Sequence, residues 1–396
     1  MVTGSVELGS RARKEIPFHR PSLGDEEVAA VVETLRTGWI TMGPKTREFE
    51  SAFAEKLGAA HAVAVSSCTA ALHLALDALG VAEGDEVIVP TYTFTATGAV
   101  VLHCGARLVL ADCEPDTLNI DPADVERKVT KKTRAIVPVH FAGHPASMDR
   151  LLEIADARGI AVVEDAAHAL PASYRGRRIG TIGRATAFSF YATKNMTTGE
   201  GGMLTTGDEE LAARVRTRRL HGLSYDAWNR YSRSGSWRYD VLYPGFKYNT
   251  TDLNAAIGLV QLARLADLQA RRNEIVGWYT ERLRDVPGLR LPTTRDGVEH
   301  AWHLYVVRIE EGRFRVTRDE VIERLRGAGI GTSVHFVPLH LHTFYRETFG
   351  WTPEDFPVAT RAAREALSLP LYPTLTEDDV DYVTETLKGI LLPARS

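Results

Sequence analysis

Short apolar runs alternate with helix-patterned stretches between residues 60 and 206. The runs are rich in Val and Ile, which is typical of a mostly parallel sheet that is covered by helices on both faces. The predicted strands cover residues 61–66, 86–89, 108–111, 135–139, 160–164, 186–191 and 202–205. The predicted helices between them cover residues 70–79, 96–103, 122–129 and 148–158. The pattern therefore predicts an α/β fold with a mostly parallel seven-stranded sheet.

The second half of the chain has a different pattern. Residues 224–250 are aromatic, basic and rich in Ser and Gly, so we expect a long functional loop there. The remaining predicted elements are a long amphipathic helix at 251–283, strands at 303–309 and 332–336, and helices at 318–328 and 377–389. The predicted domains are a polar tail over residues 1–15, a large domain over 16–265 and a smaller C-terminal α+β domain over 266–396.

The composition is that of an ordinary globular protein. Of the 396 residues, 44% are hydrophobic and 25% are charged, and the formal net charge is -4 at pH 7. Without a basic patch, we do not expect nucleic-acid binding. The three cysteines form no C-x-x-C pair, and no apolar run reaches the roughly 20 residues of a membrane span. We therefore expect a cytoplasmic protein that has no disulfide framework and no membrane anchor.

Chemically active residue types follow the predicted strands, at the edge where ligands gather in an open α/β sheet. Asp165 follows the strand at 160–164, and Lys194 follows the strand at 186–191. A lysine amine that forms a Schiff base and a carboxylate that faces a pyridinium nitrogen are two requirements of a pyridoxal phosphate site. Taken alone, a post-strand Asp is commonly a turn residue and a Lys is commonly on the surface. Their joint occurrence favours the cofactor site.

The same edge offers groups for the cofactor's phosphate and ring. Residues 67–70 open a predicted helix with hydroxyls and free backbone N–H groups, which favour an anion there, although an ordinary N-cap has the same sequence. Ser189 is a second hydroxyl candidate. Phe94 opens the predicted helix at 96–103, where its ring is a candidate to stack on the pyridine ring or to pack in the core.

Seven sequence runs together resemble one family of enzymes: FHRPSLGDEE, TGWITMGP, SSCTAALHLAL, GDEVIVPTYTFTAT, VEDAAHA, FSFYATKNMTTGEGG and GFKYNTTDLNAAIGL. The family is that of the pyridoxal phosphate-dependent aminotransferases that act on nucleotide-linked keto sugars. These enzymes have fold type I, the aspartate aminotransferase-like fold. The resemblance covers about residues 16–390. Within the family, the chain looks most like the enzymes that make UDP-4-amino-4-deoxy-L-arabinose.

The resemblance implies a role for each matching residue. Lys194 would carry the cofactor as a Schiff base, Asp165 would pair with the ring nitrogen and His168 would lie near the phenolic oxygen. The phosphate would be held by Thr69, Ala70 and Ser189 and, from the neighbouring subunit, by Asn249. His335 and Phe336 would lie on the substrate side. A homodimer with shared active sites is therefore implied.

Two departures from the family pattern concern the substrate. Phe94 stands where the arabinose branch has Trp, which preserves stacking but trims the wall of the pocket. Lys247 and Thr250 lie in a segment where many members carry an Arg soon after the phosphate-binding Asn. The resemblance therefore leaves open which cation meets the diphosphate.

The loop at 224–250 indicates a large anionic acceptor. Its Trp and Arg side chains suit a nucleotide base and a diphosphate, although the same residue types also anchor protein interfaces. The candidates are Trp228, Arg230, Trp237, Arg238 and Lys247. With the resemblance, they predict transfer of an amino group from L-glutamate to a UDP-4-ketopentose. A dTDP-4-keto-6-deoxyhexose is the nearest alternative acceptor.

Three other classes of function are weighed against this one. The histidines of HFVPLHLH, which are His335, His340 and His342, have no acidic or Cys partner at a recognised spacing, so we predict no metal site. Sugar dehydratases of the same fold replace the Schiff-base lysine with histidine, whereas Lys194 is a lysine. A non-catalytic regulator would need a nucleic-acid-binding extension, for which the sequence has no pattern.

Overall fold

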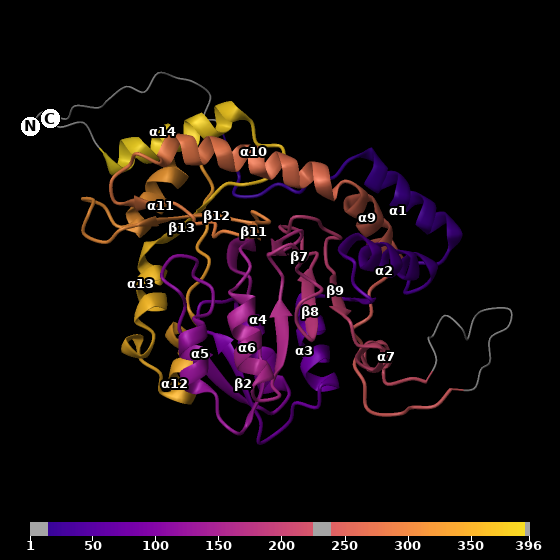
Figure 1. Cartoon of the computed structure of the whole chain (residues 1–396). Helices are drawn as coiled ribbons and strands as arrows, with labels where there is room; N and C mark the ends of the chain where they lie inside the picture. The colour runs from indigo at the N-terminus through magenta and orange to yellow at the C-terminus, as the bar shows by residue number, and fades with distance from the viewer. Residues whose placement is uncertain (1–14, 225–238, 393–396) are drawn as a thin grey trace, which may run out of the picture.

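The computed structural model describes residues 15–224 and 239–392 (Figure 1). Its centre is a seven-stranded sheet in the order β1-β9-β8-β5-β4-β2-β3, in which only β9 runs antiparallel to its neighbours. The strands are β1 (His61–Val65), β2 (Glu86–Pro90), β3 (Arg107–Ala111), β4 (Thr133–Ile136), β5 (Ala161–Asp165), β8 (Ala185–Ser189) and β9 (Gly202–Thr206). The predicted α/β fold with a mostly parallel sheet is therefore confirmed.

Helices cover both faces of this sheet, which explains why its strands are apolar throughout. One face packs on α3 (Cys68–Ala78), α4 (Thr95–His103) and α7 (Glu209–Arg218). The other face packs on α2 (Pro44–Leu57), α5 (Pro122–Lys128), α6 (Met148–Asp156) and α9 (Asp252–Ala263), and α1 (Asp25–Thr37) lies against α9. Along β1, Val63 and Val65 enter the first core while Ala62 and Ala64 enter the second, as the period of two requires.

The C-terminal part is a smaller α+β layer. Its antiparallel sheet consists of β10 (Leu289–Arg290), β12 (Tyr305–Ile309) and β13 (Ala366–Leu369). Its helices are α10 (Leu265–Leu283), α11 (Arg318–Gly327), α12 (Thr343–Phe349), α13 (Pro357–Glu365) and α14 (Glu377–Leu391), of which α10 and α14 lie side by side (Figure 1). In a third sheet, β6 (Ser173–Tyr174) pairs with β7 (Arg177–Arg178) on one side and with β11 (Val298–Glu299) on the other, and so joins the two parts of the chain.

The structure corrects two predicted elements. The helix expected over residues 251–283 is two helices that meet at Arg264, because α9 packs against α1 whereas α10 packs against α14. The strand expected over 332–336 is wrong. Only Ser333 pairs with β13, through reciprocal bonds with Ser368, because the residues after it turn towards a cavity. Within the described part of the chain, no helix has the length and apolar character to cross a membrane.

Candidate active site

A cavity of about 390 Å³ lies at the carboxyl ends of β5 and β8, between the central sheet and the C-terminal part. Many of the residues singled out from the sequence line it. They are Thr69, Phe94, Asp165, His168, Ser189, Lys194, His335 and Phe336. These residues are scattered from position 69 to position 336, and the fold brings them to one place. The cavity is therefore the candidate active site.

Asp165 is the last residue of β5 and is buried. Its Oδ2 accepts a hydrogen bond from Thr97 Oγ1 (2.8 Å), and its Oδ1 accepts one from the backbone N–H of Ala167 (3.1 Å). Burial raises the pKa of Asp165, while these two hydrogen bonds and the charge of Lys194 oppose the rise. The carboxylate is thus fixed in orientation and still faces the cavity.

Lys194 stands in the turn after β8, where its backbone N–H donates to Tyr191 O (2.9 Å). Burial lowers the pKa of its amine to about 8, and the neighbouring Cys68 and Asp165 partly oppose that shift. A neutral amine is the nucleophilic form, so this lysine is suited to attack a carbonyl carbon close to neutral pH. The next residue, Asn195, anchors the turn by donating to Ala301 O (2.6 Å).

The first turn of α3 borders the cavity. Ser67 caps the helix, with its Oγ accepting from the N–H of Ala70 (3.1 Å), and Thr69 lines the cavity beside it. Gly202 allows this close approach, because a Cβ there would lie 2.4 Å from the Ser67 carbonyl carbon. Ala70 itself does not line the cavity. The helix N-terminus, Thr69 and Ser189 together form a donor set that suits a phosphate.

The tautomers of two histidines are fixed by their partners. His168 Nδ1 accepts from the backbone N–H of Ala142 (3.3 Å), so in the neutral ring Nε2 carries the hydrogen. Asn195 Nδ2 faces the Ala301 carbonyl, so its Oδ1 must accept from His303 Nδ1 (3.2 Å), which leaves Nε2 as an acceptor. Burial is the main cause that lowers the pKa of both imidazoles well below 6.5, and the charge of Lys194 contributes to both shifts. The two neutral rings, 4.4 Å apart between centroids, therefore offer the cavity one donor and one acceptor.

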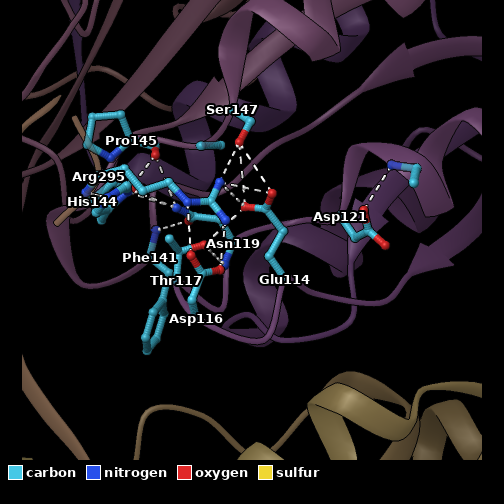
Figure 2. Close-up of polar contacts among 12 residues, drawn as sticks. Glu114, Asp116, Thr117, Asn119, Asp121, Phe141, His144, Pro145, Ser147 and Arg295 are labelled. Atoms are coloured by element: carbon cyan, nitrogen blue, oxygen red, sulfur yellow. Dashed lines mark hydrogen bonds and ion pairs between the residues drawn. The ribbon is translucent and has the colours of Figure 1, made fainter. Parts of the chain in front are cut away.

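The loop that carries Ala142 is held by Asn119 and Arg295 (Figure 2). Asn119 Oδ1 accepts from the N–H of Phe141 (2.8 Å), and its Nδ2 donates to the carbonyl of His144 (3.0 Å). The backbone N–H of Arg295 donates to His144 Nε2 (3.2 Å). The position of Ala142, whose backbone N–H donates to His168, is therefore set by residues from both parts of the chain.

Arg295 also forms ion pairs across the same junction (Figure 2). Its guanidinium donates to Glu114 (2.9 Å), to Asp116 (2.7 Å) and to Ser147 Oγ (2.9 Å). Arg295 follows β10 of the C-terminal part, whereas Glu114 and Asp116 follow β3 of the central sheet. These contacts of one guanidinium with two carboxylates link the C-terminal part to the loop that follows β3.

Aromatic rings form one wall of the cavity. The Phe336 ring stacks on the imidazole of His168, with ring centroids 5.7 Å apart and planes at 19°. The ring centroids of Phe94 and Phe336 are 6.1 Å apart. Phe94 is 59% exposed, so it belongs to the mouth of the cavity and not to the core. His335 Nδ1 lies 2.9 Å from Ser368 Oγ, and burial and Lys194 lower the pKa of His335 to about 4.

Within the described part of the chain, three predicted site residues do not line this cavity, namely Ala70, Asn249 and Lys247. Asn249 bridges to Val65 of its own chain, and its side chain contacts Lys247 Nζ and the Thr250 carbonyl. Lys247 is exposed. Arg230, together with Trp228, Trp237 and Arg238, lies outside the described residues. No cluster of three metal-ligating side chains occurs in the residues that the structure describes.

The sequence reasoning missed Thr97, Asn195 and His303. Thr97 contacts Asp165 across 68 residues of chain, and His303 contacts Asn195 across 108. No local pattern marks such contacts. A partial signal was present, since Asn195 directly follows Lys194 and Thr97 shares the TFTAT run with Phe94.

Residues 21–388 match the DegT/DnrJ/EryC1/StrS aminotransferase family. The chain belongs to this family. It is 52% identical over 377 residues to the spore coat polysaccharide biosynthesis protein SpsC of Bacillus subtilis, covering 95% of this chain and 97% of that protein. The protein is therefore an aminotransferase.

Solved structures agree with this assignment. The Streptococcus pneumoniae protein Spr1654, described as a sugar aminotransferase, superposes in its PLP form with a TM-score of 0.90 at 36% identity, over 97% of this chain and 100% of that one. Helicobacter pylori PseC, an aminotransferase involved in pseudoaminic acid biosynthesis, gives 0.88 at 28% identity, over 96% and 99%. The aminotransferase is therefore a pyridoxal phosphate-dependent sugar aminotransferase of fold type I.

The residues of the cavity fit this cofactor. It requires an amine, a carboxylate opposite the ring nitrogen, and donors for a phosphate dianion. The amine of Lys194 and the carboxylate of Asp165 both line the cavity, and Thr69 and Ser189 place hydroxyls beside the N-terminus of α3. The chemistry of the donor set therefore agrees with the family's cofactor.

Proposed function

We propose that this aminotransferase transfers an amino group from L-glutamate to a nucleotide-linked 4-keto sugar, with a UDP-4-ketopentose as the acceptor. The observation that carries the proposal is the cavity in which Lys194, Asp165 and His168 meet beneath an open aromatic mouth. The 52% identity to SpsC, named for polysaccharide biosynthesis, supports a place in amino sugar biosynthesis.

A second hollow supports a long acceptor. A largely apolar groove of about 620 Å³ continues from the first cavity and shares Thr93, Phe94 and Phe336 with it. A small keto acid would fill only the inner cavity. A nucleotide-linked sugar has further groups beyond the reacting carbon, and the shared aromatic wall is suited to contact them.

Three residues of the chain have different proposed roles in the reaction. When bound, pyridoxal phosphate supplies the carbonyl carbon that takes the amino group and a ring that accepts electrons. Lys194 would bind that carbon and move the proton at the reacting centre, and Asp165 would hold the ring nitrogen as a cation. His168, with its Nε2–H directed by the bond at Nδ1, would donate to the phenolic oxygen.

We also propose that the active site is shared between two subunits. Asn249 does not line the cavity of its own chain, which agrees with a role in the phosphate site of a partner. Mixing Lys194→Ala chains with Asn249→Ala chains should restore one intact site in each heterodimer. Random exchange should return about a quarter of the normal activity. Exchange without any recovery would rule out the shared site.

The acceptor is tested with the pyridoxamine phosphate form of the enzyme. We would offer it UDP- and dTDP-linked 4-keto sugars and follow the return of the cofactor's visible absorbance. A UDP-4-ketopentose should give the highest kcat/KM, and L-glutamate should regenerate the amino form. Failure of every nucleotide-linked sugar, with turnover of a free keto acid, would contradict the proposal.

A dTDP-4-keto-6-deoxyhexose is the second candidate acceptor, and one observation favours it. Phe94 stands at the mouth of the cavity with a ring smaller than the Trp of the arabinose branch. The space gained suits the additional methyl group of a 6-deoxyhexose. Phe94→Trp should therefore lower kcat/KM for the hexose more than for the pentose, whichever sugar is preferred by the unsubstituted enzyme.

A further inference from the structure

Thr97 lies behind the proposed cofactor carboxylate. It stands in the first turn of α4 and is fully buried, and its Oγ1 is 2.8 Å from Asp165 Oδ2. The Oγ1 of Thr93, also buried, is 2.8 Å from the Thr97 oxygen. Two hydroxyls therefore stand in series with one carboxylate.

The direction of these hydrogen bonds is determined by chemistry. An ionised carboxylate only accepts, so the Thr97 hydroxyl must donate its one hydrogen to Asp165. The Thr97 oxygen is then an acceptor, and the hydrogen between the two hydroxyls belongs to Thr93. Hydrogen bonds in series strengthen one another, so Thr93 increases the donor strength of Thr97.

Asp165 needs this support because of its burial. Removal from water raises the pKa of the carboxyl, and hydrogen bonds from Ala167 and Thr97 oppose the rise. Ala167 donates from the backbone, which no substitution of its side chain removes. The Cys68 thiol is a weak donor, 3.8 Å from Asp165 Oδ1. The Thr97 hydroxyl is therefore the stronger side-chain donor through which the protonation state of Asp165 is adjustable.

We propose that Thr97 is a positioning residue that keeps Asp165 ionised and correctly oriented, so that the proton shared with the cofactor's ring nitrogen remains on the ring. The inference rests on the proposed pairing of Asp165 with that nitrogen. One proton is involved, and it moves only between the Asp165 oxygen and the ring nitrogen. Without Thr97, the buried carboxyl competes better for this proton, and the ring becomes a weaker electron acceptor.

The test is the ring-nitrogen chemical shift in holoenzyme loaded with ¹⁵N-labelled pyridoxal phosphate. Thr97→Val keeps a branched side chain of similar size but removes the hydroxyl donor. It should move the shift towards that of a neutral pyridine, for which Asp165→Asn supplies the reference. The kcat should fall about tenfold with little change in KM, as expected for a hydrogen bond to a charged group. Thr97→Ser should restore both readouts, and Thr93→Val should give a smaller shift in the same direction.

Thr205→Val is the matched control. Thr205 is a fully buried threonine that donates to a backbone carbonyl, Gly180 O (2.8 Å), away from the cavity. Thr205→Val should lower the free energy of unfolding as much as Thr97→Val does, and it should leave the chemical shift of the ring nitrogen unchanged. An unchanged shift and kcat in folded Thr97→Val would overturn the role of Thr97 alone. A neutral ring in the unsubstituted holoenzyme would overturn the Asp165 pairing as well.

Discussion

Two buried carboxylates stand side by side on β5 and face opposite sides of the sheet. Glu164 has no solvent exposure, and its oxygens accept hydrogen bonds from His140 Nε2 (2.9 Å), Thr186 Oγ1 (2.8 Å) and the N–H of Gly183 (2.7 Å). Asp165 accepts from one hydroxyl, from one backbone N–H and, at 3.8 Å, from the Cys68 thiol, and it also lines the cavity. The first carboxylate is enclosed by protein donors, and the second still has room for another partner.

The difference shows what distinguishes a structural acid from a functional one. Both residues are buried, both accept a threonine hydroxyl, and each has a histidine nearby. The histidines are even oriented alike, since the N–H groups of Ala146 and Ala142 donate to Nδ1 of His140 and His168 respectively. What separates the two sides is the cavity, into which Asp165 and His168 are open. Unfilled acceptor capacity, and not burial, marks the site.

The largest expected effect comes from neutralising the open carboxylate. Asp165→Asn should lower kcat by about 10²–10³, because an amide does not stabilise the positive ring nitrogen that accepts electrons. Stability should be nearly unchanged or slightly higher, since a buried charge is removed. Steady-state kinetics and thermal unfolding of the same preparation measure both. Near-normal turnover would show that Asp165 is only a turn residue.

Neutralising the enclosed carboxylate should have the opposite profile. Glu164→Gln places an amide N–H₂ against a donor, either His140 Nε2 or the Thr186 and Gly183 donors. The conflict should lower the free energy of unfolding by about 1–3 kcal/mol. The kcat per folded molecule should change less than about threefold. A large loss of kcat at full stability would erase the distinction between the two acids.

The sequence goes far in predicting this arrangement, and its limits are physical. The apolar strand runs identify the sheet, and the VEDAAHA run places Asp165 and His168 at the end of β5. Local patterns do not reveal contacts between distant segments, such as Thr97 with Asp165. The predicted strand at 332–336 is wrong because only Ser333 pairs with β13, while His335 and Phe336 line the cavity.

The pKa of Lys194 should depend on Asp165 and not on Glu164. The difference is the smallest of the expected effects, and it is the sharpest test of the comparison between the two carboxylates. Burial lowers the pKa of Lys194 from 10.5 to about 8, while Asp165, which raises it, limits the fall; Glu164 has no such effect. The neutral amine reacts, so reductive methylation of Lys194 by formaldehyde and cyanoborohydride in the apoprotein should rise with pH, with a midpoint at about 8. Peptide mass spectrometry measures it.

In Asp165→Asn the midpoint should move to lower pH, because the charge that favours the ammonium form is gone. In Glu164→Gln the midpoint should stay in place, because the Glu164 carboxylate accepts hydrogen bonds from His140 and Thr186 on the other face of the sheet. Exposed lysines of the same samples supply an internal reference for the amount of reagent. An equal shift in both variants, or a midpoint near 10.5 in the unsubstituted chain, would mean that the cavity does not separate the two acids electrostatically.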